Sequence, residues 1–422
     1  MDNLFRYTLG DDGIAMITID QKDNPANLFS FEFIDAYLEV AGGAVADDRV
    51  RGVIVTSARR IFMAGADLRE LAALDANSEF IFNKIMETHR RYRAIETGGK
   101  PFVAAINGTA LGGGMELCLT CHHRIVLDQP DIKLGFPEVR VGLLPGGGGT
   151  AKLPYLLGLQ NGLTYLLQGT QARPPKALKD GLVDEVAATH EEMLAAARKW
   201  ITENPNPVQP WDDPHYHLPG GGLMTPSGAQ IMMAAIARVR QQTRGNYPNV
   251  QYILSTVHDG LQVSIDRALE TEARYFTKAL RTKEAKNMIR TGFLEMQAAQ
   301  KGKARPKGIA KYEVKKLGII GAGMMGGGIA CVSARAGMEV VLTDITPEKA
   351  AAGKSYSEKV LDKALAKGRT TPEKVSALMA RIHPAVGVGA MKGCDLVVEA
   401  VFEDLDLKHR VLKETESVLD AG

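Results

Sequence analysis

The sequence predicts an α/β protein made of at least two domains. Patterns typical of buried strands alternate with helical patterns along the chain, which is the first indication of this class. The second is a glycine-rich turn that twice joins an apolar strand to a helix, at Gly112–Gly114 and again from Gly321. The chain has 422 residues, 45% hydrophobic and 24% charged, so it can bury more than one hydrophobic core.

Charge balance and hydropathy exclude several classes of protein. Lys and Arg (51) nearly balance Asp and Glu (49), and the net charge of +2 argues against a nucleic-acid partner. No apolar run is long enough to predict a transmembrane segment, and residues 1–13 do not form a signal peptide, so we expect a cytoplasmic protein. Four scattered cysteines predict neither a disulfide framework nor a metal site.

Two literal motif matches do not predict a site. Cys118–His122 spells the C-x-x-C-H of haem attachment, but it lies on the helix after the first glycine turn and no export signal precedes it. We interpret its cysteines as small buried thiols. The run PGGGGTAK at Pro145–Lys152 lacks the spacing of a P-loop.

The first glycine turn places backbone N–H groups beside a carboxylate. Pro101–Ile106 predicts a buried strand and MELCLT a helix, so the glycines lie at a helix start. The first N–H groups of a helix lack internal partners and can bind a substrate oxygen. Glu116 falls in the first turn of this helix, and Glu138 follows Pro137 on a later loop. Each carboxylate alone fits an ordinary structural role, but the two together can act as acid and base.

A second turn upstream can supply another N–H donor. The strand pattern Arg51–Ala58 is followed by IFMAGADL at Ile61–Leu68, a sharp turn of small residues. This turn can present the N–H of Ala66. Two N–H donors directed at one oxygen form an oxyanion hole.

These residues resemble those of a known family. FMAGADL, AINGTALGGGMEL, KLGFPEVRVGLLPGGGG and GLVDEV are similar in order and spacing to the enoyl-CoA hydratase (crotonase) family, over about the first 190 residues. The resemblance implies a ββα spiral, a coenzyme A thioester substrate, and an oxyanion hole formed by Ala66 and Gly113. Glu116 would then activate water and Glu138 would protonate C2. Isomerases of the family usually keep only the second carboxylate, so we expect a hydratase, with Δ3-Δ2-enoyl-CoA isomerase as the alternative.

The acyl chain length is not fixed by the sequence. Candidate walls of the tail pocket are Leu68, Leu71, Phe80 and Phe136. Each of these side chains equally fits a position in the core.

The second glycine turn has the pattern of a dinucleotide-binding site. G-x-G-x-x-G at Gly321, Gly323 and Gly326 follows a strand pattern and opens a helix, and the next strand ends in Asp344. We expect the helix start to bind the pyrophosphate and Asp344 to bind the adenosine ribose. An acid at this position, with no Arg after it, favours NAD over NADP.

A third strand pattern, Cys394–Asp404, ends in acidic residues. This region resembles the 3-hydroxyacyl-CoA dehydrogenase family, in which such a strand and loop line the nicotinamide side. The resemblance implies that the residues contacting NAD include Met325, Asp344, Val401, Glu403 and Lys408. For the last two, the alternative is a solvent-exposed ion pair.

We expect three segments along the chain. Residues 1–190 form the hydratase core, residues 191–310 complete it with helices and a linker, and residues 311–422 form an incomplete NAD-binding (Rossmann) domain. Helical patterns cover 228–243 and 250–280 within the middle segment.

The order of these domains resembles the multifunctional subunits of fatty-acid β-oxidation, which implies a thiolase as partner. The catalytic His of that family's dehydrogenase lies beyond the third strand, and the only histidines after Asp344, His383 and His409, do not stand in its motif. We therefore expect a truncated chain that hydrates but does not oxidise, with a three-stranded remnant that binds NAD weakly or not at all. The alternative is a noncatalytic fragment that binds acyl-CoA or NAD, or docks a thiolase.

Overall fold

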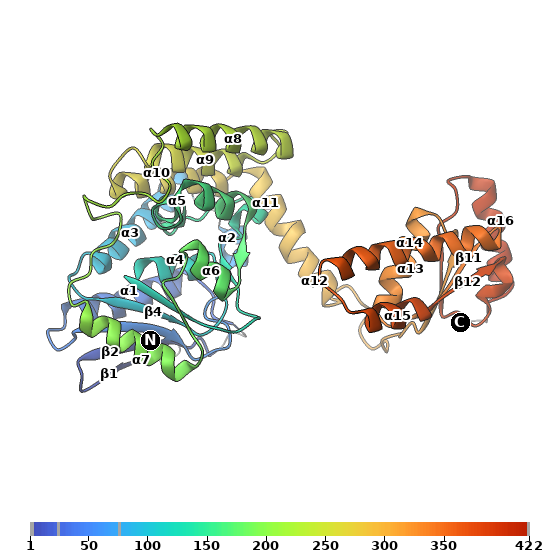
Figure 1. The fold of residues 1–422 in the computed structure, drawn as a ribbon, viewed down its shortest axis with the longest axis horizontal. Helices are drawn as coiled ribbons and strands as arrows, with labels where there is room; N and C mark the ends of the chain where they lie inside the picture. Colours follow the sequence, from blue (N-terminus) through green and yellow to red (C-terminus); the bar gives the residue numbers. More distant parts are fainter. Residues whose placement is uncertain (1–3, 23–25, 75–76, 420–422) are drawn as a thin grey trace. The chain divides into compact units, whose positions relative to one another are not determined.

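Two compact units make up the structure, Met1–Arg305 and Pro306–Gly422. The computed structural model describes residues 4–22, 26–74 and 77–419. Each unit has a hydrophobic core of its own, and Figure 1 shows the first unit in blue to yellow and the second in orange to red.

A six-stranded sheet of order β1-β2-β3-β4-β6-β9 forms the base of the first unit. β1 and β2 are antiparallel, and the other neighbouring strands are parallel. β3 and β4 are buried along their whole length, as expected from continuous apolar runs in a parallel sheet. The strands are β1 Phe5–Leu9, β2 Ile14–Ile19, β3 Gly52–Ser57, β4 Phe102–Ile106, β6 His123–Leu127 and β9 Glu185–Ala187.

The first unit also contains a three-stranded sheet of order β5-β7-β8. Its strands are β5 Ala110–Leu111, β7 Leu134–Gly135 and β8 Gln171–Ala172. The chain passes from the large sheet to the small one and then into a helix. It does so first through β4, β5 and α4 (Gly113–Thr120), and again through β6, β7 and the 3₁₀ helix η1 (Glu138–Val141). This repeat confirms the expected ββα spiral, and it places the end of each turn in one region.

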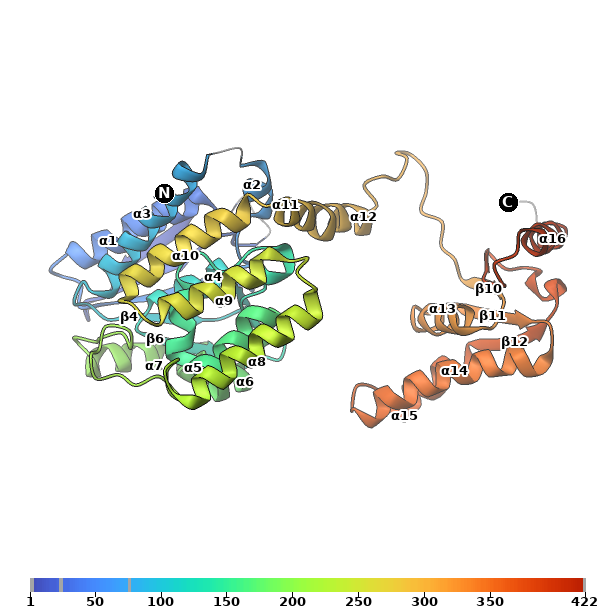
Figure 2. The ribbon, with the colours of Figure 1, turned by 90° about the horizontal axis from the view of Figure 1, so that it is seen from above.

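In the first unit, helices α7 to α10 come after the strands of the spiral in the chain. α7 packs on β4 and β6, and α10 packs on α3, α5 and α9. Figure 2 shows α8, α9 and α10 side by side. The helical pattern predicted over 250–280 forms two helices, α9 and α10, instead of one. The helices are α1 Phe31–Ala46, α2 Leu68–Ala73, α3 Ser78–Glu96, α4 Gly113–Thr120, the 3₁₀ helix η1 Glu138–Val141, α5 Gly149–Gln168, α6 Pro174–Asp180, α7 His190–Glu203, α8 Pro226–Thr243, α9 Pro248–Gly260, α10 Ile265–Leu280, α11 Lys283–Ile289, the π-helical η2 Arg290–Glu295 and α12 Met296–Gln300.

The second unit is a parallel sheet of order β12-β11-β10-β13. Its strands are β10 Lys316–Ile320, β11 Glu339–Asp344, β12 Ile382–Val386 and β13 Leu396–Glu399. Its helices are α13 Met324–Arg335, α14 Pro347–Ala366, α15 Pro372–Ala380, the 3₁₀ helix η3 Val388–Met391 and α16 Leu405–Glu416. Of the helices that the structure describes in either unit, none combines the length and hydropathy that crossing a membrane requires.

The expected three-stranded remnant is wrong, because β12 adds a fourth strand. β12 is an edge strand, mostly exposed, and contains Pro384, so its sequence lacks the apolar run of a central strand. The third predicted strand is also shorter than expected. β13 ends at Glu399, and Asp404 instead caps α16 by accepting the N–H of Leu407.

Candidate active site

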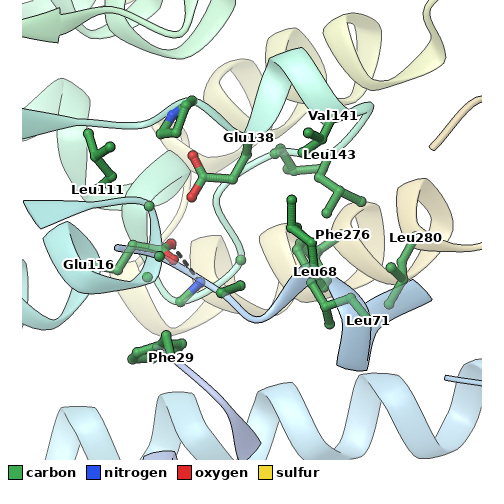
Figure 3. A pocket seen from close by; sticks show the side chains of 18 of the residues that line it. Phe29, Leu68, Leu71, Leu111, Glu116, Glu138, Val141, Leu143, Phe276 and Leu280 are labelled. Atoms are coloured by element: carbon green, nitrogen blue, oxygen red, sulfur yellow. Dashed lines mark hydrogen bonds between the residues drawn. The ribbon is translucent and has the colours of Figure 1, made fainter. Parts of the chain in front are cut away.

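A cavity of about 420 Å³ lies in the first unit where turns of the spiral end. Figure 3 shows Glu116 and Glu138 on one side of it and Leu68, Leu71 and Leu280 on the other. The cavity therefore has a polar end and an apolar wall, as many ligand sites do.

The glycine turn before α4 is shaped by close contacts. Gly112 has φ +53°, and a Cβ there would collide with the carboxylate of Glu138. A Cβ on Gly113 would lie 2.6 Å from the ring of Phe29. A larger residue at either position would displace Glu138 or Phe29, and both glycines line the cavity.

The turn at Ile61–Leu68 contacts the glycine turn that precedes α4. Phe29 forms a parallel bridge with Ala66, in which the N–H of Phe29 donates to the O of Gly65 at 2.9 Å. In such a bridge the N–H of Ala66 itself points away from Phe29. A Cβ on Gly112 would lie 3.8 Å from the Cα of Gly65, so the two turns are in contact. Among the described residues, the N–H groups of Ala66 and Gly113 have no hydrogen-bond partner.

Glu116 is 4% exposed and is held by a loop from another turn of the spiral. Its Oε1 accepts the N–H of Gly147 at 2.6 Å and the N–H of Gly149 at 2.9 Å. Burial raises the pKa of Glu116 well above its usual range, and the carboxylates of Glu138 and Glu272 add to the rise. The two N–H donors oppose this rise because they favour the ionised form.

Glu138 begins the 3₁₀ helix η1 and borders the cavity. Its Oε2 is buried and has no hydrogen-bond partner among the described residues. Burial raises the pKa of Glu138 to about 8, and the nearby Glu272 carboxylate acts in the same direction. A carboxyl group of this kind holds its proton at neutral pH.

The sequence analysis missed a third carboxylate, Glu272, which is fully buried on α10. Its Oε1 accepts the N–H of Gly148 at 2.6 Å, and its Oε2 accepts the N–H of Ala151 at 2.8 Å. The signal that could have found it is its spacing: Glu272 occupies the same helical stripe as the buried Ala268 and Leu269. A Glu on the apolar stripe needs dedicated hydrogen-bond donors, which the glycine loop supplies.

The tail-pocket candidates divide into two groups. Leu68 and Leu71 line the cavity, whereas Phe80 is 55% exposed outside it and Phe136 is fully buried in the core. The structure adds apolar lining that sequence reasoning did not find, from Ile34, Ile81, Ile85, Phe276, Leu280 and Phe293. Cys118 and Cys121 are buried free thiols away from the lining.

In the second unit, two of the three fingerprint glycines make close backbone contacts and the third faces open space. Gly321 has φ +102°, and a Cβ there would overlap the backbone O of Ala400. A Cβ on Gly326 would overlap the backbone O of Gly321. Gly323, in contrast, has no described atom within 4 Å of its Cβ position. Open space beside the start of α13 fits the close approach of a pyrophosphate.

Asp344 lies at the same edge of the sheet as the glycine turn. Its Oδ2 accepts the N–H of Ala322 at 2.8 Å, 22 residues earlier in the chain. The expected carboxylate and the expected turn are therefore adjacent, and Met325 is exposed in the first turn of α13.

The remaining cofactor candidates form a charged cluster after β13. Lys408 lies 3.1 Å from Glu403 and 3.0 Å from Glu399, a residue that sequence reasoning did not single out. The N–H of Val401 donates to Glu399 at 2.6 Å. In the ion pair with Lys408, Glu403 is 88% exposed and Lys408 is 23% exposed.

Comparisons with known proteins match both units. Residues 10–209 match a family described as enoyl-CoA hydratase/isomerase, and residues 316–422 match a family described as 3-hydroxyacyl-CoA dehydrogenase, NAD binding domain. The fatty acid oxidation complex subunit alpha of Shewanella baltica is 35% identical over 425 residues, and that of Shewanella loihica 36% identical over 426. Both alignments cover 99% of this chain and 58% of the relative, so the chain spans less than two thirds of those proteins.

A solved structure was also aligned with this chain. The crystal structure of human mitochondrial Δ3-Δ2-enoyl-CoA isomerase aligns with a TM-score of 0.49 and 22% identity. The alignment covers 71% of this chain and 99% of that one.

Proposed function

We propose that the chain hydrates trans-2-enoyl-CoA thioesters in fatty-acid β-oxidation, because residues 10–209 match the enoyl-CoA hydratase/isomerase family and residues 316–422 match the NAD-binding domain family of 3-hydroxyacyl-CoA dehydrogenases. The observation that carries this proposal is a single cavity that brings together two buried carboxylates and two N–H groups with no partner among the described residues. The product of hydration is a 3-hydroxyacyl-CoA, which is the substrate class of the second unit's family.

The N–H groups of Ala66 and Gly113 bind the thioester oxygen. Addition of water to the double bond moves negative charge onto this oxygen, as in an enolate. Fixed donors stabilise that charge in the transition state, and loss of one such donor costs about 10²–10³ in rate. The glycine turn is suited to this work because its close contacts fix the backbone before substrate arrives.

The two carboxylates divide the proton transfers. Glu116 takes one proton from water, the hydroxyl oxygen bonds to C3, and Glu138 gives its proton to C2. The double bond is lost and one molecule of water is added. Return of the proton from Glu116 to Glu138 through solvent restores the starting state.

Hydrogen bonding supports this assignment of roles. The two N–H donors to Oε1 of Glu116 favour its ionised form, which a general base requires. Oε2 of Glu138 has no donor among the described residues, and burial raises the pKa of this carboxyl to about 8. Two buried carboxyl groups that repel each other hold one proton between them.

We propose that the second unit binds NAD, which accepts a hydride when bound. The start of α13 would hold the pyrophosphate, and Asp344 would accept from the adenosine ribose hydroxyls. The pair His383 and Glu339, 2.7 Å apart, lies where β11 and β12 begin, at the edge of the sheet opposite the glycine turn. It is therefore not offered as an acid–base pair for oxidation.

A second candidate function is Δ3-Δ2-enoyl-CoA isomerisation. Glu138 alone can move a proton between carbons of the substrate, because its unpartnered oxygen borders the cavity. Hydration needs Glu116 as well. The variant Glu116→Gln separates the two: it abolishes hydration, and it retains double-bond movement only if the isomerase proposal is correct.

We also propose a thiolase partner and a cytoplasmic location. The relatives are named as subunits of a fatty acid oxidation complex. A thiolase consumes the 3-ketoacyl-CoA that oxidation of the hydration product yields. Co-expression with a thiolase subunit followed by size-exclusion chromatography tests the partner, since separate elution of the two proteins contradicts it.

The direct test is the loss of enoyl-thioester absorbance when the chain is added to crotonyl-CoA. The expected result is turnover by the unmodified chain and loss of turnover in Glu116→Gln and Glu138→Gln. Absence of turnover by the unmodified chain supports the noncatalytic alternative instead.

A further inference from the structure

The loop after Pro145 binds two carboxylates through its backbone N–H groups. Its N–H groups alternate between partners: those of residues 147 and 149 donate to Glu116, and those of residues 148 and 151 donate to Glu272. These donors lie at the start of α5, where a helix leaves its N–H groups without internal partners. The loop binds one carboxylate of the proposed active site and one from outside it.

The helix α10 holds this loop by two neighbouring side chains. Glu272 and Phe276 are four residues apart and therefore share one face of α10. The Phe276 ring lies so close to Gly146 that a Cβ there would collide with it. On the α3 side, Nε2 of His89 lies 2.9 Å from the backbone O of Gly146. The loop is thus fixed from α10 and α3 at once.

We propose that Glu272 is a positioning residue for hydration: it fixes the glycine loop, and the loop in turn fixes the carboxylate of Glu116. The inference rests on the hydratase function proposed above. Glu272 lies beyond residues 10–209, the range that matches the hydratase/isomerase family. Glu272 is not among the residues that line the cavity, so it contributes to the acid–base chemistry without touching the substrate.

The charge of the Glu272 side chain, as well as its packing, affects the proposed catalytic carboxyl groups. The ionisable groups around Glu272 are Glu116 on α4, Glu138 on η1, and His89 on α3 at 3.5 Å. Lys152 on α5 lies beside Gly148, whose N–H donates to Glu272. Lys152 is paired with Glu96, a buried carboxylate on α3. The Glu272 carboxylate thus lies near two other carboxyl groups, and it raises the pKa of both Glu116 and Glu138.

The first test measures titration and does not depend on activity. The infrared carbonyl band of protonated carboxyl groups is followed against pH in the whole chain, and Glu138→Gln identifies the band of Glu138. In Glu272→Gln the midpoint of this band should fall by about one pH unit, because a like charge is lost. The control Glu270→Gln, a surface residue paired with Arg267 and Arg274, should keep the wild-type midpoint.

The second test measures position through kinetics. Glu272→Asp keeps the charge but withdraws the carboxylate from the loop, so kcat for crotonyl-CoA should fall by about 10–100-fold with little change in KM. Its titration midpoint should stay close to that of wild type. A variant that only unfolds the protein would show neither of these patterns, and circular dichroism checks this.

The outcomes separate the inference from the proposed function. No hydration by the wild-type chain contradicts the hydratase proposal, while the titration still decides whether Glu272 sets the ionisation of Glu138. A Glu272→Gln midpoint equal to that of wild type overturns the inference. In an active chain, wild-type kcat in Glu272→Asp overturns it as well.

Discussion

Glu116 and Glu272 accept hydrogen bonds from alternate N–H groups of residues 147–151. One carboxylate belongs to the spiral and the other to a helix near the end of the first unit. Because a single loop binds both, a shift of α10 changes the position of the proposed catalytic base. The candidate site therefore depends on helices that carry none of its reacting groups.

The proposed proton donor is tested by Glu138→Gln. Gln fills the same space but has no proton to give to C2, so kcat for hydration should fall by about 10²–10⁴-fold. The matched control is Glu203→Gln, an exposed carboxylate at the end of α7, which should retain wild-type kcat. Steady-state assay with crotonyl-CoA measures both, and a Glu138→Gln variant with full activity would remove this residue from the mechanism.

The pH dependence of hydration follows from the same residue. Glu138 must be protonated to act, and its pKa is about 8, so kcat/KM should be highest below that pH. As the pH rises through about 8, the protonated fraction falls and kcat/KM should drop by about tenfold per further pH unit. A profile from about pH 6 to about pH 9.5 checks this, and activity that rises across pH 8 would contradict the assignment.

The glycine loop is tested by Gly147→Ala. A Cβ at this position would lie 3.0 Å from Oε2 of Glu116, so the carboxylate must shift, and kcat should fall by about 10–100-fold. The control Gly43→Ala lies in α1 with nothing described within 4 Å. It should keep full activity and raise the free energy of unfolding by about 0.5–1 kcal/mol. Equal activity in the two variants would show that the loop does not position Glu116.

NAD binding is tested by Gly323→Ala. No described atom approaches its Cβ position, so the unit should unfold at the wild-type temperature in the absence of NAD. The added methyl group lies where the pyrophosphate would approach, so NAD should raise the melting temperature of wild type but not of this variant. The control Gly328→Ala, in α13 with equally open surroundings, should keep the NAD-dependent shift. An identical shift in both variants would place the pyrophosphate elsewhere.

Local sequence patterns predicted the parts of the fold that depend on local physics. The continuous apolar runs of β3 and β4 and the glycine turn before α4 were found because burial and helix starts leave short-range signatures. The fingerprint around Gly321 was found for the same reason. Gly321 and Gly326 are required by close backbone contacts, which leave no room for a Cβ at either position.

The rest depends on tertiary contacts that no short pattern records. Phe80 and Phe136 suit a pocket as well as Leu68 and Leu71 do, and only packing decides which of them line the cavity. Glu272 finds its partners more than a hundred residues away along the chain. The edge strand β12 is mostly exposed, so its sequence does not need the apolar run by which a buried strand is recognised.

The central claim is that this chain adds water to an enoyl-CoA, and the origin of the atoms in the product tests it most directly. Crotonyl-CoA is incubated with the chain in deuterated water that also carries labelled oxygen, and the product is analysed by mass spectrometry. The account predicts 3-hydroxybutyryl-CoA with solvent oxygen at C3 and one deuterium at C2, and loss of this product in Glu116→Gln. Unchanged crotonyl-CoA, or a product without solvent oxygen at C3, would contradict it.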